Sequence, residues 1–218
     1  MGYGNNTLDE LRTWILDCTK CDLSSLKNRR PVPGWGNPNA NIMLIGEAPG
    51  AVENKSGKPF VGRSGQLLTN MLRLADIQSA RIYTTNVAKC WPDSDKNGKQ
   101  KSPTKKQMAT CISHYLVKEL EIVNPSIVIA LGSKALGAIL PGEKISDCHG
   151  RLIDKGGTAI IPMYHPAAAI HQPRLMNVIR EDFTRIPELV KRWMDGDRID
   201  VPSELVSPGN ENLAINPY

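Results

Sequence analysis

Aromatic residues are scarce in this chain of 218 residues: they make up 5% of it, and Phe60 and Phe183 are its two phenylalanines. An extended stacking surface is therefore excluded, and any aromatic contact with a flat ligand must be local. Apolar runs are also short, and none approaches the ~20 residues that a membrane-spanning helix needs. The N-terminus lacks the basic and apolar segments of a secretory signal. We expect an intracellular protein without membrane contact.

The overall composition is that of an ordinary globular protein, with 40% hydrophobic and 22% charged residues. The length fits one sizeable domain and is short for two. Lysine and arginine total 27 against 22 acidic residues, which gives a formal charge of +5. A mildly basic domain favours a polyanionic partner, although many basic proteins never bind nucleic acid.

Apolar periodicity predicts strands separated by helices. Thr7 and Glu10 form the pattern of a helix capping box, and Thr104 with Gln107 forms a second one. Predicted helices cover 7–18, 66–75, 104–123, 132–140 and 174–194, and predicted strands cover 42–45, 82–85, 126–131 and 158–161. We expect one domain over residues 1–195 and a polar tail over 196–218.

Strands that alternate with helices indicate an α/β fold around a parallel sheet. Ligands bind such sheets outside the carboxyl ends of the strands. Glu47, Asn86 and His165 each follow a predicted strand. Each residue alone is typical of a turn, but their common placement predicts a site with a carboxylate, an amide and an imidazole.

Five cysteines in an intracellular protein indicate metal ligation or burial rather than disulfides. Cys18 and Cys21 form a CxxC pair, and Cys90 and Cys111 follow at wide spacing. Four thiolates can hold zinc or an iron–sulfur cluster. The remaining Cys148 is expected to be a buried free thiol.

Several ordered motifs resemble those of the family 4 uracil-DNA glycosylases, which are the iron–sulfur type. The resemblance extends from about Leu11 to Phe183. The matching segments are Gly46-Glu-Ala-Pro-Gly50, Glu53, Gly57-Lys-Pro-Phe-Val-Gly62, Gly65-Gln-Leu-Leu68, Asn86-Val-Ala-Lys-Cys90, Pro125-Ser-Ile-Val-Ile-Ala-Leu-Gly132 and Tyr164-His-Pro-Ala-Ala168.

The resemblance implies a three-layer α/β/α sandwich with a central four-stranded parallel sheet. It implies a monomeric DNA repair enzyme of the cytoplasm or nucleoid that acts on single- or double-stranded DNA. Such an enzyme flips uracil out of the DNA and hydrolyses its N-glycosidic bond, leaving an abasic site.

The resemblance also assigns chemical roles. Glu47 would stabilise positive charge on the sugar, and His165 would donate a hydrogen bond to the departing uracil. The Asn86 amide can pair with uracil O4 and N3–H but mismatches cytosine. Phe60 would stack on the base, and Glu53 would be a second carboxylate of the pocket. As alternatives, Phe60 could pack in the core, and Glu53 could be a solvated loop charge.

The remaining implied contacts are with substrate, DNA and cofactor. Substrate contacts are expected at Gly46, Ala48 and Gly50, and DNA contacts at Pro166, Ala167, Ile170 and Lys101. A structural [4Fe–4S] cluster is implied on Cys18, Cys21, Cys90 and Cys111.

One departure from the family pattern bears on the mechanism. A lysine-rich stretch between Cys90 and Cys111 stands where a covalent DNA-binding relative carries an attacking histidine, but residues 91–103 contain no histidine. Hydrolysis is therefore favoured over covalent capture. A non-catalytic nucleic-acid-binding relative on the same scaffold is the other alternative, and a metabolic nucleotide enzyme finds no support because phosphate-loop motifs are missing.

Overall fold

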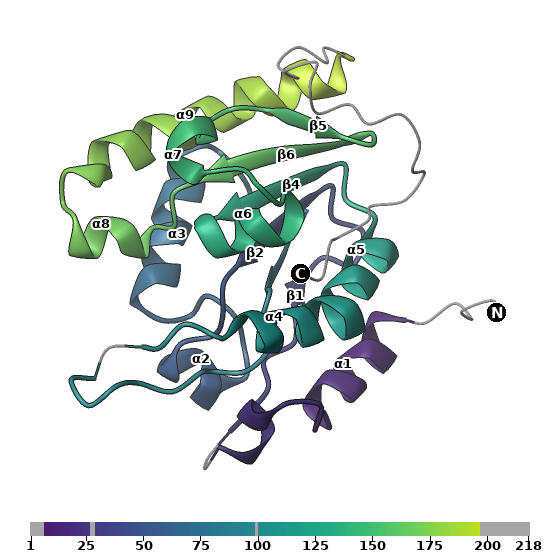
Figure 1. Ribbon diagram of the computed structural model, residues 1–218. Coiled ribbons are helices and arrows are strands. Elements are labelled where there is room, and N and C mark those ends of the chain that lie inside the picture. Colours follow the sequence, from purple (N-terminus) through teal and green to yellow (C-terminus); the bar gives the residue numbers. More distant parts are fainter. Residues whose placement is uncertain (1–6, 27–28, 99, 197–218) are drawn as a thin grey trace.

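A six-stranded mixed sheet forms the centre of the molecule in a computed structural model, which describes residues 7–26, 29–98 and 100–196 (Figure 1). The strand order is β1-β3-β2-β4-β6-β5. The four central strands are parallel, and β1 and β5 add antiparallel edges. The strands are β1 (Trp35–Gly36), β2 (Ile42–Gly46), β3 (Ile82–Asn86), β4 (Ile127–Leu131), β5 (Ile153–Lys155) and β6 (Thr158–Met163).

The four predicted strands are confirmed, and they are the parallel centre of the sheet. The expected total of four strands is wrong, because two edge strands extend the sheet to six. β1 has two residues and β5 has three. Neither is long enough to show the alternation by which a strand is read from sequence.

The predicted helices are confirmed with shifted ends. α1 begins after Thr7 and α4 after Thr104, and both caps have the predicted capping box. The short helices α2, α7 and α8 were not predicted. The helices are α1 (Leu8–Leu16), α2 (Ala51–Ser56), α3 (Arg63–Leu74), α4 (Lys105–Cys111), α5 (Val117–Val123), α6 (Ser133–Ile139), α7 (Ile145–Cys148), α8 (Ala167–His171) and α9 (Leu175–Met194).

Three short helical turns complete the secondary structure of the described residues. Two are 3₁₀ turns, η1 (Asp22–Ser25) and η2 (Ser79–Arg81). The third, η3 (Ile112–Leu116), is a π-helical turn that joins α4 to α5 without a break. The predicted helix over 104–123 is therefore one continuous helical segment with a π turn at its middle.

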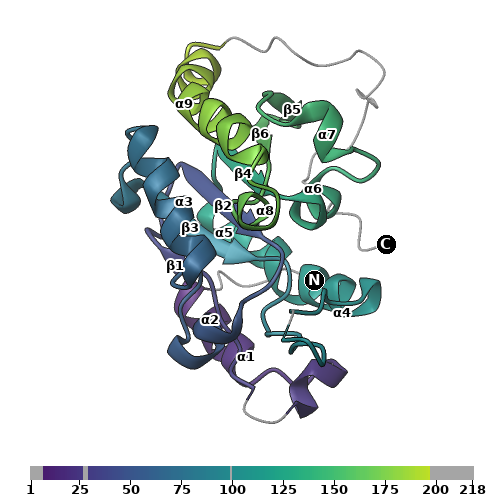
Figure 2. The ribbon, with the colours of Figure 1, turned by 90° about the vertical axis from the view of Figure 1, so that its left-hand side faces the viewer.

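Helices cover both faces of the sheet (Figure 2). Side chains alternate along β2, so Met43 and Ile45 pack in one apolar cluster while Ile42 and Leu44 pack in the other. The first cluster is covered by α4, α5 and α6, and the second by α3 and α9. Buried strands of this kind read as continuous apolar runs, which is why they could be predicted.

No helix among the described residues is long and apolar enough to cross a membrane. The predicted tail lies outside the described residues from 197 onward.

The N-terminal cap of α4 can be tested by substitution. It bears on the predicted cysteine centre, because α4 ends at Cys111. The Thr104 hydroxyl accepts from the Gln107 backbone N–H at 3.2 Å. We expect Thr104→Ala to lower the free energy of unfolding by about 1 kcal/mol, measured by urea denaturation. Thr110→Ala on the same helix is the matched control, because its hydroxyl donates to the Lys106 carbonyl and caps nothing. Equal effects of the two variants would contradict the capping role.

Candidate active site and cysteine centre

The candidate site begins where β2 and β3 end side by side. Gly46 lies opposite Asn86 in the parallel register. The pairing continues beyond the strands: Val87 N–H donates to Gly46 O at 2.8 Å, and Ala88 N–H donates to Glu47 O at 2.9 Å. Glu47 is half-buried at this edge. The structure thus brings the predicted carboxylate, Glu47, and the predicted amide, Asn86, onto neighbouring hydrogen-bonded segments.

Gly46 is required by close packing. A methyl group at this position would lie 2.5 Å from Asn86 Oδ1 and 2.8 Å from Phe60 Cζ. Both distances are far below a normal van der Waals contact. The missing side chain therefore lets the Asn86 amide and the Phe60 ring approach each other over the β2 backbone.

Phe60 has a left-handed backbone conformation, with φ at 54°. Gly65, in the first turn of α3, makes this possible, since a methyl group there would lie 2.0 Å from Phe60 O. The Phe60 ring is half-buried, and its centroid is 6.4 Å from that of His165 at an interplanar angle of 26°. Loop strain of this kind is common at ligand sites and indicates that the ring is held in a set orientation.

Glu53 closes the loop that carries Phe60. Its Oε2 accepts from Gly50 N–H at 3.1 Å and its Oε1 accepts from Gly62 N–H at 2.7 Å. The side chain is 7% exposed, so it is not a solvated loop charge. Glu53 fixes the loop over 50–62, and its contact with substrate stays a prediction.

His165 follows β6 and has a defined tautomer. Its Nδ1 accepts from the Ala167 backbone N–H at 3.1 Å, so the ring proton is on Nε2. Burial lowers the pKa of His165 to about 4, although the nearby Glu53 charge opposes this shift. At neutral pH the ring is therefore an uncharged donor through Nε2. Gly132 leaves room for it, since a methyl group there would be 3.2 Å from His165 Cβ.

The predicted DNA-contacting residues lie on two segments. Pro166 is buried, whereas Ala167 and Ile170 on α8 are half-buried. Lys101 is exposed on the segment after Cys90, where Ser94 and Gln100 pair as a β-bridge. Gln100 Nε2 donates to Pro49 O at 3.2 Å, so this segment packs against the 46–50 loop.

A groove of about 830 Å³ lies behind Phe60, between α3 and the β1–β3 edge. Its walls include Trp35, Phe60 and Thr84, but Glu47, Asn86 and His165 do not line it. The groove therefore shares the Phe60 ring with the candidate site but contains none of its carboxylate, amide and imidazole groups.

The four predicted ligand cysteines form a second centre. All are free thiols; three are buried and Cys21 is half-buried. Burial and the neighbouring Cys111 raise the pKa of Cys90 to about 12, and Arg29 opposes this. The pKa of Cys111 rises to about 11 through burial, with Cys21 and Cys18 adding to it. The thiols thus lie within electrostatic range of one another.

Over the described ranges 7–26, 29–98 and 100–196, no three Cys, His, Asp or Glu side chains are grouped as a site for a single metal ion. Cys148 is a buried free thiol, as predicted, and its Sγ donates to Lys144 O at 3.2 Å.

Sequence reasoning missed three charged residues. Arg29 Nη1 donates to Cys18 O at 2.6 Å and reaches Cys90 Sγ at 4.0 Å. Lys89 and Glu119 form a buried ion pair behind Asn86. The position of Lys89, between apolar residues and Cys90, was the signal that could have indicated burial.

Comparison with known proteins agrees with this geometry. The model of the uracil DNA glycosylase superfamily matches residues 33–186. A type-4 uracil-DNA glycosylase of Thermotoga maritima is 37% identical over 183 residues, covering 82% of this chain and 92% of that protein. A type-4 uracil-DNA glycosylase of Archaeoglobus fulgidus is 37% identical over 192 residues, covering 84% and 93%. A type-5 uracil-DNA glycosylase of Pyrobaculum aerophilum is 30% identical over 181 residues, covering 75% of each chain.

The chain therefore belongs to the uracil-DNA glycosylase superfamily. Within it, the identity over most of both chains makes it a member of the type-4 uracil-DNA glycosylases.

The packing at Gly46 generates a first prediction. Gly46→Ala should displace Asn86 or Phe60 and slow uracil excision by about 10²-fold, the order of loss that a misplacement of ~1 Å causes. Gly137→Ala on α6 is the matched control, because a methyl group there meets no atom within 4 Å and suits a helix. Excision at the unmodified rate by Gly46→Ala would contradict the close-packed arrangement.

The tautomer of His165 generates a second prediction. ¹⁵N NMR of the ring should report the Nε2–H tautomer at neutral pH and a pKa near 4, with His165→Asn identifying the signals. The lowered pKa also means that stability from the neutral ring is present above pH ~6.5 and is lost as pH falls towards 4, because the unfolded chain takes up the proton first. A ring that titrates near pH 6.5 would refute the assignment.

Proposed function

We propose that this protein removes uracil from DNA by hydrolysis of the N-glycosidic bond, with Glu47, Asn86, Phe60 and His165 as the chemical site. Its family supports this activity, since type-4 uracil-DNA glycosylases match most of its length. The observation that carries the assignment of the site is the meeting of Asn86 and Phe60 over Gly46, with His165 beside the Phe60 ring.

Base recognition uses a stacking face and an amide. The Phe60 ring offers an apolar face to a flipped base, and base–aromatic stacking is worth about 1–3 kcal/mol. The Asn86 amide donates to uracil O4 and accepts from N3–H. Cytosine presents a donor and an acceptor at the opposite positions, so each mismatched buried group costs about 1–3 kcal/mol.

Bond cleavage separates charge, and the two catalytic side chains act on opposite charges. As the bond between the sugar and uracil N1 breaks, positive charge grows on the sugar and negative charge on uracil O2. The Glu47 carboxylate stabilises the sugar and orients water for attack. The Nε2–H of neutral His165 donates to O2, in the manner of an oxyanion hole.

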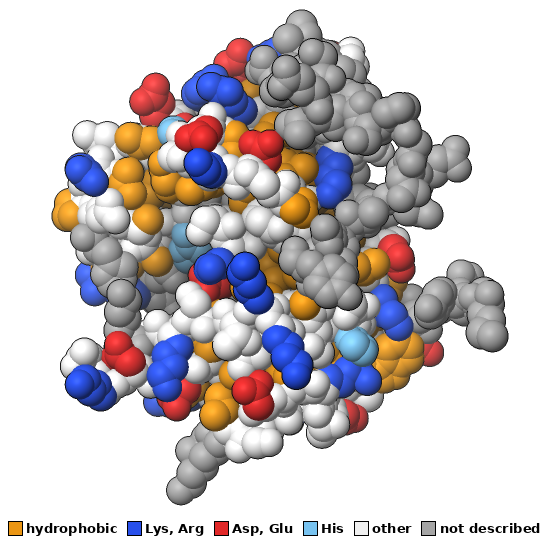
Figure 3. Space-filling view, viewed as in Figure 1, with side chains coloured by type: hydrophobic (Ala, Val, Ile, Leu, Met, Phe, Trp, Pro, Cys, Tyr) orange, Lys and Arg blue, Asp and Glu red, His pale blue; other side chains and the backbone are white. Residues whose placement is uncertain are grey.

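DNA is the partner that this chemistry requires. Lys101 would contact phosphate, and the α8 segment with Pro166, Ala167 and Ile170 would approach the strand around the flipped nucleotide. On the face in Figure 3, lysine and arginine side chains are spread among acidic ones rather than gathered in one patch. Phosphate contacts such as that of Lys101 should make binding depend on salt.

The donor set fits a [4Fe–4S] cluster. Cys18, Cys21, Cys90 and Cys111 are free and lie within mutual electrostatic range, which is the thiolate number that such a cluster uses. A bound cluster would supply a structural cross-link rather than redox chemistry. The cysteines would then tie the segment after α1 to the chain that follows Asn86.

The experiment that tests the function measures single-turnover excision on an oligonucleotide with one uracil, read as strand cleavage by alkali. Glu47→Gln and His165→Ala should each slow excision by ~10²–10³, as expected for a lost transition-state contact. Affinity for the oligonucleotide should change much less, because phosphate contacts dominate it. Glu188→Gln, an exposed carboxylate on α9, is the control. Near-normal excision in both site variants would show that the site is wrongly assigned.

The same reaction distinguishes hydrolysis from its alternatives. Hydrolysis predicts multiple turnovers and no protein–DNA adduct after denaturation. A denaturation-resistant adduct would instead favour covalent capture, and binding without product would favour a non-catalytic relative.

The cluster is tested by colour. Anaerobically purified protein should be yellow-brown and absorb near ~400 nm, as thiolate-ligated iron does. Cys111→Ser should lose the colour, whereas Cys148→Ser should keep it, because Cys148 lies outside the set. Colourless protein with one zinc ion per chain would refute the cluster.

A further inference from the structure

A buried ion pair lies next to the backbone of Asn86, the residue proposed to recognise uracil. Lys89 Nζ is 2.6 Å from Glu119 Oε2, and the two side chains are 1% and 0% exposed. Lys89 is on the segment after β3, and Glu119 is on α5. Because both side chains are buried, neither can contact a substrate, and the proposed chemistry does not use them.

All three protons of the Lys89 ammonium are used within the protein. Besides Glu119, Nζ donates to Thr85 Oγ1 at 2.7 Å and to the Asn86 backbone oxygen at 2.6 Å. Lysine has three donors and no acceptor, so this is a complete set of partners. The side chain therefore folds back over three residues and holds the main chain of Asn86.

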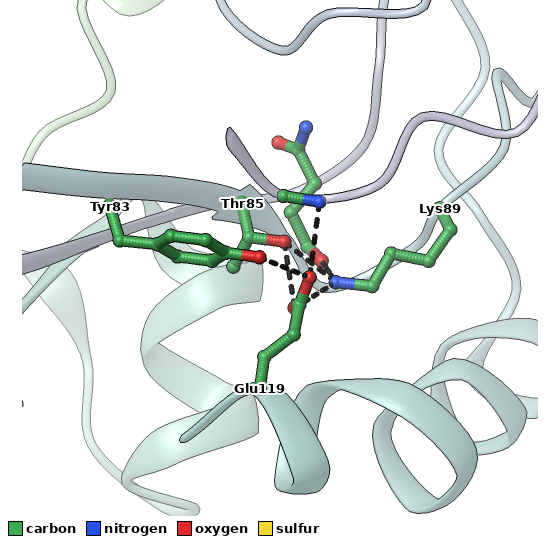
Figure 4. A network of polar contacts seen from close by, with 6 residues as sticks. Tyr83, Thr85, Lys89 and Glu119 are labelled. Atoms are coloured by element: carbon green, nitrogen blue, oxygen red, sulfur yellow. Dashed lines mark hydrogen bonds and ion pairs between the residues drawn. The ribbon is translucent and has the colours of Figure 1, made fainter. Parts of the chain in front are cut away.

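Glu119 gathers donors from three further positions (Figure 4). Its Oε1 accepts from Gly34 N–H at 3.1 Å and from the Tyr83 hydroxyl at 3.3 Å. Its Oε2 accepts from the Thr85 hydroxyl at 2.8 Å in addition to Lys89. The carboxylate thus anchors Lys89 to helix α5 and to the end of β3.

The pair also touches the cysteine centre. Lys89 immediately precedes Cys90 in the chain, and its backbone N–H is hydrogen-bonded to the Cys111 sulfur. One residue thus contacts the chain of Asn86 and the surroundings of two ligand cysteines.

Stability alone does not explain the pair. Well-packed neutral residues in place of a buried ion pair are often as stable or more stable. What such a pair does provide is a fixed geometry, because each charge must keep its partners. Here the geometry that is fixed is the backbone carrying the Asn86 amide.

We propose that Lys89 and Glu119 are positioning residues for uracil recognition, which hold Asn86 in register with the base pocket and connect it to the cysteine centre. This inference rests on the proposed role of Asn86.

The test compares Lys89→Met with the neutral double variant Lys89→Met/Glu119→Gln; Lys134→Met, an exposed lysine on α6, is the control. Lys89→Met leaves a buried carboxylate without its cation, so both the unfolding temperature and excision should fall. The double variant has no unpaired charge, so its unfolding temperature should recover. Its excision should stay ~10²-fold below that of the unmodified protein, because no donor holds the Asn86 carbonyl.

Binding separates recognition from DNA affinity. One oligonucleotide carries 2′-fluoro-2′-deoxyuridine, which resists cleavage, and a second carries a tetrahydrofuran abasic analogue. We expect the double variant to bind the first more weakly than the unmodified protein does and the second equally well, with absorbance near ~400 nm retained. Excision and base preference that recover together with stability would overturn the proposal.

Two outcomes are kept distinct. If the unmodified protein fails to excise uracil, the proposed function fails, while the binding comparison still tests the pair. If the double variant does not fold, Glu119→Gln replaces it: the Lys89 ammonium loses the carboxylate that anchors it, so the preference for the uracil analogue over the abasic analogue should weaken. A preference equal to that of the unmodified protein in Glu119→Gln would overturn the proposal.

Discussion

The parallel pairing of β2 with β3 is the interaction on which the site depends. It continues for two residues beyond the strands, through Val87 N–H to Gly46 O and Ala88 N–H to Glu47 O. Neighbouring strands lie about 4.8 Å apart, so this register sets the separation of the Glu47 carboxylate and the Asn86 amide. A slip of one residue would turn every side chain to the opposite face and exchange the two apolar clusters. The core that fixes the register thus also fixes the chemistry.

Around this pairing, the loops are held by hydrogen bonds within the protein. Glu53 bonds two backbone N–H groups of its own loop, and Lys89 bonds the carbonyl of Asn86. His165 has its tautomer fixed by the Ala167 N–H. Donors and acceptors that are already oriented need no reorganisation when charge develops, which is where electrostatic catalysis gains most. The side chains of the site are therefore ordered when the protein folds, and binding of the substrate does not have to order them.

The sequence predicted the parts of the fold that have strong local signals. The buried run over β4 and the capping boxes at Thr7 and Thr104 were found because their patterns are complete within a few residues. Helix α2 was missed because its six residues lie between Gly50 and Gly57 and show no apolar period. The edge strands were too short to be recognised.

The candidate-site residues at the strand ends could be predicted from the sequence, but the buried charged residues that support them could not. Asn86 and His165 follow apolar runs, so topology alone brings them to one edge. Lys89 and Glu119 could not be paired from sequence, because charged residues are expected at the surface and their 30-residue separation carries no periodic signal. The two hydrogen bonds that the Glu53 carboxylate accepts from Gly50 and Gly62 likewise depend on loop geometry that no short sequence pattern encodes.

The π turn η3 has a consequence for helix phase. Cys111 and Glu119 are eight positions apart, which in a regular α-helix at ~100° per residue would place them about 80° out of phase. A π turn accommodates one extra residue, so the interval behaves as about seven helical positions, roughly 20° short of two full turns. The wider turn therefore returns the thiol and the carboxylate to one side of the helix, where both meet Lys89. Deleting one residue within Ile112–Leu116 would give a regular α-helix with seven positions between Cys111 and Glu119, which keeps the two on one side. A regular α-helix of unchanged length would instead turn Glu119 about 80° away from Cys111, so the π turn and the extra residue belong together.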